Sequence, residues 1–366
     1  MMKEKLLELE KYEKEMLLLI AKIFNDSLEE FDTSLDNSYG YLDKIVLSLI
    51  MASKNKRSYN PFAEIIEKYA LNILTKKFQQ NGFELLPLGY SSDLTLRNEK
   101  FILNIDIKTA NLDNLSDFKN TINLGINQIT HIAKLPLNRK YLDSPYYVYP
   151  TVPPYYDDTT LKYILSFGLM FIYPSYKDLI EKVTKEYYEL FSFFNDKIKN
   201  NLIEKIEKKE ELLKSLETKE GNYSRLYLIT ESIIRGIFLH KIERNNIFRK
   251  LGLSEKEIEK IKNFEDKLIR FSSNLKERKI KPIAIVCISI PNGLLKDYYL
   301  SDFRSGKSYA KSARYHYGKG IFKLIKKIER QEESRVLFID INKQYIDKLK
   351  EIFKNIYLFK YDIRKI

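Results

Sequence analysis

Residues 91–110, SSDLTLRNEKFILNIDIKTA, are the stretch that decides the predicted fold. Two runs rich in apolar and β-branched residues, 94–96 and 101–107, flank the polar residues 97–100. Apolar and polar residues that alternate on both sides of a polar turn are typical of a β-hairpin and not of a helix. We therefore expect two antiparallel strands joined by a tight turn.

The length of this turn decides which side chains share a face of the hairpin. A turn of two or four residues places Asp93 opposite Asn104 and diagonal to Asp106. Since side chains alternate with a period of two, Asp93, Asp106 and Lys108 then point the same way. Diagonal neighbours lie roughly 7–8 Å apart at the backbone, so two carboxylates can hold one cation between them. A three-residue turn would instead turn Asp93 to the opposite face.

Asp93, followed after twelve residues by Asp106, Ile107 and Lys108, resembles the PD-(D/E)xK signature of a nuclease superfamily that includes most type II restriction endonucleases. Ser92 departs from the pattern, because proline is common at that position. The resemblance covers residues 61–134 closely. It implies an α/β (α+β) fold whose mixed central sheet, of the restriction-endonuclease-like type, is flanked by helices.

The resemblance also implies a role for each residue of the motif. Asp93 and Asp106 would be ligands of a Mg²⁺ ion, and the main-chain carbonyl of Ile107 would complete its coordination. Lys108 would lie beside the scissile phosphate and orient water or stabilise the pentavalent state. The alternative for Asp106 and Lys108 is a simple salt bridge on an edge strand.

A helix is predicted before the hairpin. Asn60 is a suitable N-cap, Pro61 suits the first turn, and Gly82 marks the end. Glu64 and Glu67 lie one turn apart on this helix, so both can reach one face. Related nucleases often supply a glutamate near the metal from this helix, which makes Glu64 the first candidate and Glu67 the second. The alternative is an exposed glutamate paired with a lysine of the same helix.

A second helix is predicted after the hairpin, over residues 115–133. The resemblance places a helix here that approaches the scissile phosphate, so Gln128 is a candidate contact to phosphate or water. The alternative is a polar rim on an amphipathic helix. Buried strands are predicted at residues 161–173 and 281–290, and a β-α-β pattern over residues 336–361 completes the sheet.

A second informative stretch, residues 303–328, carries eight basic residues and no acidic one. Lysine, arginine and tyrosine donate to phosphates, and arginine also reads guanine. The candidates for binding DNA are Arg304, Lys307, Lys311, Arg314 and Tyr315, with the two arginines the best candidates for base contacts. The alternative is a solvated basic loop.

The composition agrees with a polyanionic partner. Lys and Arg number 63 against 50 acidic residues, which gives a formal net charge of +13 and a pI near 9.2. One cysteine excludes a disulfide framework, and three histidines far apart in sequence argue against a His-rich zinc site. No apolar run reaches the ~18 residues that span a membrane, so we expect a cytoplasmic protein with no membrane partner.

The chain is predicted to have four segments. They are N-terminal helices for packing or dimerisation (1–57), a catalytic core with the hairpin (58–175), a helical insertion rich in Glu and Lys (176–278), and core-completing strands with the basic segment (279–366).

These observations predict a type II restriction endonuclease, an endodeoxyribonuclease that cuts double-stranded DNA. Cutting both strands of a palindromic site calls for two active sites, and the chain has one motif, so we expect a homodimer. A cognate DNA methyltransferase acting on the same site would be its partner in a restriction-modification system. The alternatives are a repair or recombination nuclease of the same superfamily and a non-catalytic DNA-binding helical protein.

Overall fold

The computed structural model describes residues 2–39, 63–86, 92–112, 121–125, 128–130, 133–135, 146–148, 150, 152–156, 161–174, 177–204, 214–216, 218–220, 223–239, 244–277, 281–305, 312–317, 320–325, 334–353 and 356–359. The chain divides into two compact units. The first comprises residues 1–35, 60–175 and 281–366, and the second comprises residues 36–59 and 176–280.

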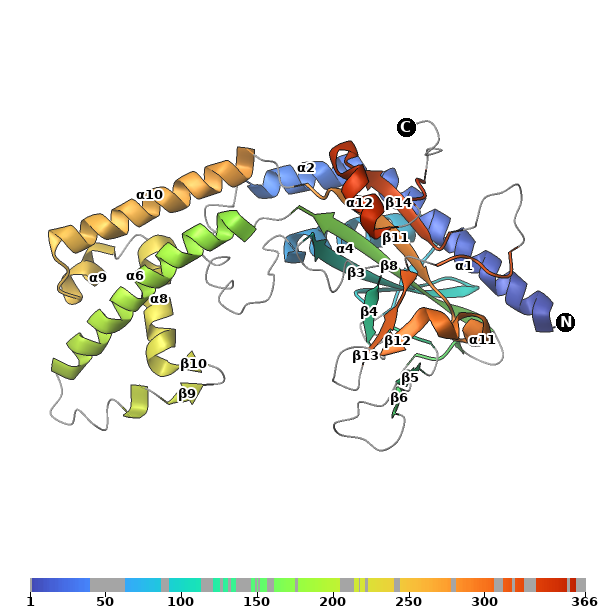
Figure 1. The fold of residues 1–366 in the computed structure, drawn as a ribbon, viewed down its shortest axis with the longest axis horizontal. Coiled ribbons are helices and arrows are strands. Elements are labelled where there is room, and N and C mark those ends of the chain that lie inside the picture. Colours follow the sequence, from blue (N-terminus) through green and yellow to red (C-terminus); the bar gives the residue numbers. More distant parts are fainter. Residues whose placement is uncertain are drawn as a thin grey trace. The chain divides into compact units, whose positions relative to one another are not determined.

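The first unit is built on a seven-stranded mixed sheet (Figure 1). Its strands run in the order β1-β2-β3-β8-β11-β14, and β7 also pairs with β8. Their bounds are Glu84–Leu85 (β1), Leu94–Arg97 (β2), Phe101–Asn111 (β3), Tyr155–Tyr156 (β7), Lys162–Tyr173 (β8), Ala284–Ile290 (β11) and Val336–Ile341 (β14). Strands β3 and β8 are parallel, and the other pairs are antiparallel. The predicted mixed central sheet flanked by helices is confirmed.

Strands β2 and β3 form the predicted antiparallel hairpin, with Leu94 opposite Ile105. Continuing this register by one residue places Asp93 opposite Asp106. The predicted parity is therefore confirmed, but the predicted register is wrong by two residues on β3, because it placed Asp93 opposite Asn104.

The turn explains this difference. The Asn98 backbone N–H donates to the Phe101 carbonyl (3.0 Å), so Glu99 and Lys100 form the tip of the hairpin. The Asn98 side-chain oxygen accepts hydrogen bonds from the backbone N–H of Lys100 (2.9 Å) and of Phe101 (2.7 Å). A side chain that bonds to its own turn in this way moved the tip one residue beyond the predicted position.

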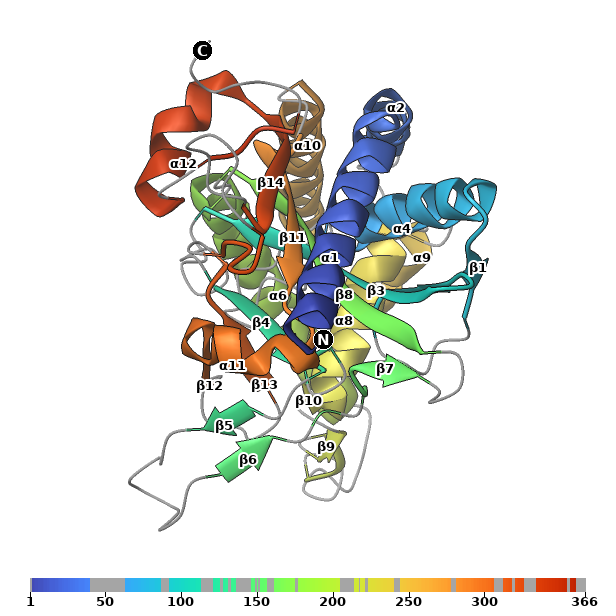
Figure 2. The same ribbon diagram turned by 90° about the vertical axis from the view of Figure 1, so that its right-hand side faces the viewer.

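Helices cover one face of the sheet. Their bounds are Met2–Asn25 (α1), Leu28–Tyr39 (α2) and Ala63–Gln80 (α4). Helix α1 packs against β11 and β14, and α4 packs against β3 (Figure 2). The rings of Phe24 in α1 and Phe31 in α2 contact Phe171 in β8, at centroid distances of 5.5 and 5.2 Å. The apolar periodicity of these helices is thus satisfied by the sheet.

The ends of these helices test the predicted helix boundaries. The N-terminal helices predicted within residues 1–57 are separated between α1 and α2, where the buried Ser27 hydroxyl donates to the Ile23 carbonyl (2.9 Å). Helix α4 ends as predicted, with Gly82 at a φ of 81° and the Phe83 N–H donating to the Phe78 carbonyl (3.0 Å). The predicted start at Asn60 and Pro61 lies outside the described residues.

A small three-stranded sheet, in the order β12-β13-β4, lies on the other face. Its strands are Ile122–Gly125 (β4), Phe303–Ser305 (β12) and Ser312–Tyr315 (β13). The Ile122 side chain packs against the backbone of β8 at Gly168. A Cβ atom added to Gly168 would lie 2.8 Å from the Ile122 Cδ1, so a larger residue at this position would collide with Ile122. Gly168 and Phe171 are an odd number of residues apart on one strand, so Ile122 and the α1 side chains lie on opposite faces.

The helix predicted over residues 115–133 is wrong in its described part. Residues 122–125 form strand β4, and residues 128–130 form a turn. Ile122 and Leu124 point inward and belong to one buried cluster, which is the period of two of a strand. Strands β5 (Ala133–Leu135) and β6 (Tyr146–Val148) then pair with each other.

The C-terminal segment completes the main sheet. A short 3-10 helix, η5 (Lys343–Tyr345), leads from β14 into α12 (Ile346–Ile352). The Phe353 ring packs edge-on to Phe338 of β14, with centroids 4.9 Å apart. In place of the predicted last strand, the described residues show a single parallel bridge between Phe338 and Leu358.

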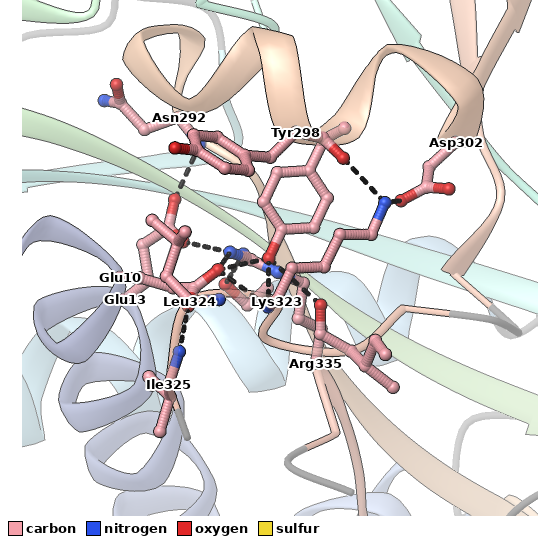
Figure 3. A network of polar contacts seen from close by, with 12 residues as sticks. Glu10, Glu13, Asn292, Tyr298, Asp302, Lys323, Leu324, Ile325 and Arg335 are labelled. Atoms are coloured by element: carbon pink, nitrogen blue, oxygen red, sulfur yellow. Dashed lines mark hydrogen bonds and ion pairs between the residues drawn. The ribbon is translucent and has the colours of Figure 1, made fainter. Parts of the chain in front are cut away.

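A buried charge network ties α1 to the C-terminal half of the first unit (Figure 3). The Arg335 guanidinium is fully buried and contacts Glu13 Oε2 (2.5 Å) and Glu10 Oε1 (3.3 Å). Glu10 also accepts hydrogen bonds from the backbone N–H of Lys323 (3.0 Å) and Leu324 (2.7 Å). Burial raises the pKa of Glu13, although the Arg335 charge opposes this shift. The network fixes the end of the basic segment on α1.

The second unit is helical in its described part. Its elements are α6 (Lys177–Glu204), β9 (Lys219–Glu220), β10 (Tyr223–Ser224), α8 (Arg225–Leu239), α9 (Arg244–Lys250) and α10 (Glu255–Glu277). Helix α6 packs against α8 and α10. Aromatic pairs hold these helices together, with ring centroids 4.8 Å apart for Phe191 and Tyr227 and 5.6 Å apart for Phe238 and Phe264.

Helix α10 begins with a capping box. The Ser254 N–H and hydroxyl both bond to Glu257 Oε2, at 2.8 and 2.9 Å. We expect Ser254→Ala to destabilise the second unit by about 1 kcal/mol, because helix N-caps contribute about that much. Urea unfolding followed by circular dichroism measures this change. An unchanged midpoint would show that the box contributes nothing to stability.

Among the described residues, no helix is long and apolar enough to cross a membrane. Cys287 is buried in β11, as its apolar surroundings in the sequence predict.

Candidate active site

The motif residues meet at the end of the β2–β3 hairpin. Asp93 immediately precedes β2, and Asp106 and Lys108 lie on β3. Asp93 Oδ2 accepts a hydrogen bond from the Ile107 backbone N–H (2.7 Å). The N–H and C=O of one strand residue point to the same neighbouring strand, so the Ile107 carbonyl faces the Asp93 side as well.

Asp106 is the buried centre of the cluster, at 2% exposure. Its Oδ2 lies 2.7 Å from the Lys108 Nζ, and its Oδ1 accepts a hydrogen bond from Gln128 Nε2 (2.7 Å). Burial raises the pKa of Asp106 to about 7, and the nearby Asp93 adds to the shift while Lys108 opposes it. The two aspartates are thus close enough for their charges to interact.

Lys108 carries the compensating positive charge. Burial alone would favour its neutral amine, but the carboxylates of Asp106, Asp93 and Glu67 outweigh this effect and raise its pKa. Its side chain is 37% exposed, so the ammonium group remains accessible from solvent. Lys108 is therefore a protonated donor at the rim of the carboxylate cluster.

Helix α4 contributes one glutamate to this region. The Thr109 hydroxyl donates to Glu67 Oε1 (3.4 Å), and the Glu67 charge acts on Lys108. Glu64 lies in the first turn of α4, but its side chain is outside the described part of the chain. The structure therefore brings Glu67, the second candidate from the sequence, to the edge of the site.

Gln128 enters the site from the turn after β4. Its Oε1 accepts a hydrogen bond from the Gly125 N–H (2.8 Å), while its Nε2 donates to Asp106. Sequence reasoning named Gln128 as a phosphate or water contact on a helix. It missed the contact with Asp106, which depends on a chain reversal that the sequence pattern did not reveal.

Three of the candidate DNA-binding residues lie on the small sheet. Arg304 of β12 and Arg314 of β13 are register partners. Lys307 and Lys311 lie outside the described residues. Tyr315 is fully buried and packs on Phe303, with ring centroids 5.0 Å apart. Its prediction as a DNA contact is corrected, because the alternation of β13 turns Tyr315 into the core.

The donor set of the site suits a divalent cation. Hard cations prefer oxygen ligands, and Mg²⁺ usually takes one or two carboxylates together with water and phosphate oxygens. Asp93 and Asp106 supply two adjacent carboxylates, and burial, with a smaller effect of Asp93, raises the pKa of Asp106, which a bound cation would offset. Within the described residues, no group of three or more His, Cys, Asp or Glu side chains is placed to hold a metal ion. The predicted metal ligands are only two carboxylates and one main-chain carbonyl, so they do not amount to a group of three such side chains.

Comparison with known proteins finds a family that resembles the part of the chain containing this hairpin. Residues 5–178 match the family model of the N-terminal domain of the type II restriction enzyme MwoI. The match spans both aspartates, Lys108, α4 and Gln128. This match supports the class that the D…DxK hairpin predicted, that of the type II restriction endonucleases.

Two solved structures are also similar to the chain. One is the restriction endonuclease BglI bound to its DNA recognition sequence, with 14% identity, a TM-score of 0.37, and coverage of 94% of this chain and 99% of that chain. The other is the tetrameric restriction endonuclease SfiI bound to cognate DNA, with 11% identity, a TM-score of 0.31 and 79% coverage of each chain. No curated protein sequence matches significantly.

Proposed function

We propose that this restriction endonuclease hydrolyses phosphodiester bonds of double-stranded DNA at a specific sequence, at a Mg²⁺ site formed by Asp93 and Asp106. The observation that carries the proposal is the convergence of two carboxylates and one ammonium group on one side of the β2–β3 hairpin. Asp106 touches Lys108 at 2.7 Å and lies close enough to Asp93 for the charge of Asp93 to raise its pKa.

Asp93, Asp106 and the carbonyl of Ile107 would hold the ion. When bound, Mg²⁺ lowers the pKa of a water nucleophile and offsets the negative charge that develops on the phosphate. The ion would also remove the repulsion between the two aspartates. This repulsion and the burial of Asp106 provide the electrostatic reason for a cation to bind here.

The other side chains position the reacting groups. Lys108 is protonated and partly exposed, so it can donate to a non-bridging phosphate oxygen or orient the attacking water. Its charge is fixed beside the reacting phosphate before the reaction begins, which is the electrostatic stabilisation that a charged transition state needs. A catalytic role for Glu64 remains a proposal from the sequence.

Recognition is proposed for the basic segment. Alternation on β13 places Arg314 on the face opposite Tyr315, away from the core, where its side chain is half-buried. We propose Arg304 and Arg314 as base contacts, and Lys307 and Lys311 as phosphate contacts. Arginine can bond a guanine through two atoms, whereas lysine contacts phosphate as a point charge.

The remaining assignments concern assembly. We propose a homodimer, since each chain supplies one motif and a double-strand cut needs two. Residues 1–57 would serve packing or dimerisation, residues 58–175 and 279–366 the nuclease core, and residues 176–278 a helical insertion. A DNA methyltransferase that modifies the same site would protect the host DNA.

The pH dependence of cleavage follows from Asp106. Its pKa lies at about 7, above the ordinary value, so the carboxylate that binds the ion is lost as the pH falls through 7. At limiting Mg²⁺ we expect the cleavage rate to fall about tenfold per pH unit below pH 7, because protons and metal compete for one group. Single-turnover rates measured from pH 5.5 to 8.5 test this. Raising the Mg²⁺ concentration should shift the acidic limb of the pH–rate profile to lower pH. An acidic limb that stays at the same pH at every Mg²⁺ concentration would contradict the assignment.

Incubation of the protein with plasmid DNA and Mg²⁺ tests the function itself. Discrete fragments with a common end sequence are expected of a sequence-specific enzyme. Smearing, or cutting restricted to branched DNA, would instead indicate a repair or recombination nuclease. Intact DNA across a range of divalent cations would indicate a non-catalytic DNA-binding protein.

A further inference from the structure

We propose that Gln128 is a positioning residue that couples the recognition sheet, β12-β13-β4, to the catalytic carboxylate of Asp106. The inference rests on the proposed function and assigns the step by which sequence recognition reaches the active site. It starts from the two hydrogen bonds of one amide group.

The amide of Gln128 has only one orientation that satisfies both partners. A side-chain amide has an acceptor oxygen on one side and a donor nitrogen on the other. The Gly125 N–H is a donor and therefore requires Oε1, at 2.8 Å. The same choice directs Nε2 to the acceptor Oδ1 of Asp106, at 2.7 Å. The position of the β4 backbone thus determines where Gln128 holds the carboxylate.

The β4 backbone is in turn part of the recognition sheet. Gly125 is the register partner of Ser312 on β13, and Asn123 is the partner of Arg314. A force that DNA exerts on Arg314 therefore reaches Asp106 through one strand pair and one side chain. The path consists of the β13–β4 pairing, the backbone of β4 and the two hydrogen bonds of Gln128.

The surroundings make this path stiff. Ile129 is fully buried, and the Thr130 hydroxyl accepts a hydrogen bond from the Gly293 N–H (2.7 Å), so both residues after Gln128 are anchored. Ile122 at the start of β4 packs against the sheet at Gly168, the register partner of Asp106 on β8. A small displacement of β4 therefore moves the Gly125 N–H that Gln128 contacts, while the residues after Gln128 stay anchored.

The consequence is a link between recognition and rate. Asp106 Oδ2 is held by Lys108 and Oδ1 by Gln128, so the direction of its remaining lone pairs depends on both contacts. At the correct sequence, the recognition sheet docks fully and Gln128 holds the carboxylate in its productive orientation. At a sequence with one wrong base, the sheet docks imperfectly and this orientation is lost.

The test compares Gln128→Met with the matched control Thr130→Val. Methionine has similar length but cannot make either hydrogen bond, while Thr130→Val loosens the same turn without touching Asp106. Single-turnover cleavage is measured at the enzyme's own site, mapped from plasmid fragment ends, and at the same site with one base changed. DNA affinity is measured by gel shift without divalent metal.

We expect Gln128→Met to lower the rate at the mapped site by about 100-fold, because a carboxylate misplaced by about 1 Å costs that much. The ratio of rates between the two sites should fall by about tenfold, a typical coupling between sites. DNA affinity should be unchanged. Thr130→Val should lower the thermal midpoint of unfolding and leave the ratio unaltered.

Other outcomes overturn the inference. If Gln128→Met slows both sites by one common factor, Gln128 only supports the fold of the site. If it changes neither rate, Gln128 has no role in catalysis. These results are distinct from a failure of the proposed function, which would show itself as Asp106→Asn cutting at the wild-type rate.

Discussion

Replacing Asp106 with asparagine is expected to lower the rate of DNA cleavage by about 1000-fold or more, because a bound metal ion contributes several kcal/mol and each ~1.4 kcal/mol is tenfold in rate. Asparagine keeps the size of the side chain and the acceptor oxygen that Gln128 contacts. It removes the negative charge that would hold the cation. Binding of DNA without metal should remain, since phosphate contacts are made by basic residues elsewhere.

Glu84→Gln provides the matched control for Asp106→Asn. Glu84 is also a carboxylate near the hairpin, but it is exposed and pairs with Arg97 (2.8 Å). The Glu84→Gln variant should cleave DNA at the wild-type rate. The measurement is single-turnover cleavage of a plasmid in Mg²⁺, accompanied by a gel shift and a thermal unfolding curve. An Asp106→Asn protein that is folded and cuts at an undiminished rate would refute the assignment of the active site.

Replacing Arg335 with leucine is expected to destabilise the protein by about 3–5 kcal/mol, the cost of leaving buried charges without their partner. Arg335 neutralises Glu13 and Glu10 in the core, where both carboxylates are fully buried. Its guanidinium also lies between the rings of Tyr299 (4.4 Å) and Phe322 (4.3 Å). Leucine fills part of this space but leaves two buried carboxylates without a positively charged partner.

The loss of stability should depend on pH. Burial already raises the pKa of Glu13 above that of the unfolded chain, and loss of the arginine raises it further. A raised carboxyl pKa means that the folded state binds more protons, so stability falls as the pH rises through the folded-state value. The defect of Arg335→Leu should therefore be larger at pH 8 than at pH 5. Adding Glu13→Gln to this variant should restore part of the lost stability.

Arg97→Leu is the control for this experiment. Arg97 also pairs with a glutamate, but on the surface, where such pairs contribute about 0–1 kcal/mol. Urea unfolding followed by circular dichroism at both pH values measures all four proteins. Equal effects of Arg335→Leu and Arg97→Leu would show that the buried network does not stabilise the fold.

The sequence was sufficient for the hairpin because its signals are local. Alternation with a period of two identified β2 and β3, and the same alternation placed Asp106 and Lys108 on one face. The register could not be predicted, because the Asn98 side chain bonds to the turn and competes with the backbone pairing. The parity was predicted correctly, and parity alone decides that the two aspartates share one face of the hairpin.

The missed contacts all join distant parts of the chain. Strand β4 pairs with β13, and Gln128 reaches Asp106 only after this pairing brings the turn over the main sheet. No local pattern near residue 128 carries that information. Glu10 and Glu13 gave a weak signal, because they interrupt the apolar face of α1, but their partner Arg335 lies at the other end of the chain.

The choice between Glu64 and Glu67 shows a different limit. Both residues lie on the helix face that sequence periodicity turns toward the hairpin, and spacing alone did not separate them. The contact between Glu67 and Thr109 depends on how far α4 slides along β3. That offset is decided by packing in three dimensions and has no counterpart in the linear pattern.

The most direct test of the account is the anomalous scattering of Mn²⁺ soaked into crystals of the protein bound to DNA. Manganese prefers the same oxygen ligands as magnesium and can be located by its own signal. The account predicts a peak coordinated by carboxylate oxygens of both Asp93 and Asp106, beside a phosphate of the DNA. A peak elsewhere, with these two carboxylates free of metal while DNA lies against another face, would contradict it.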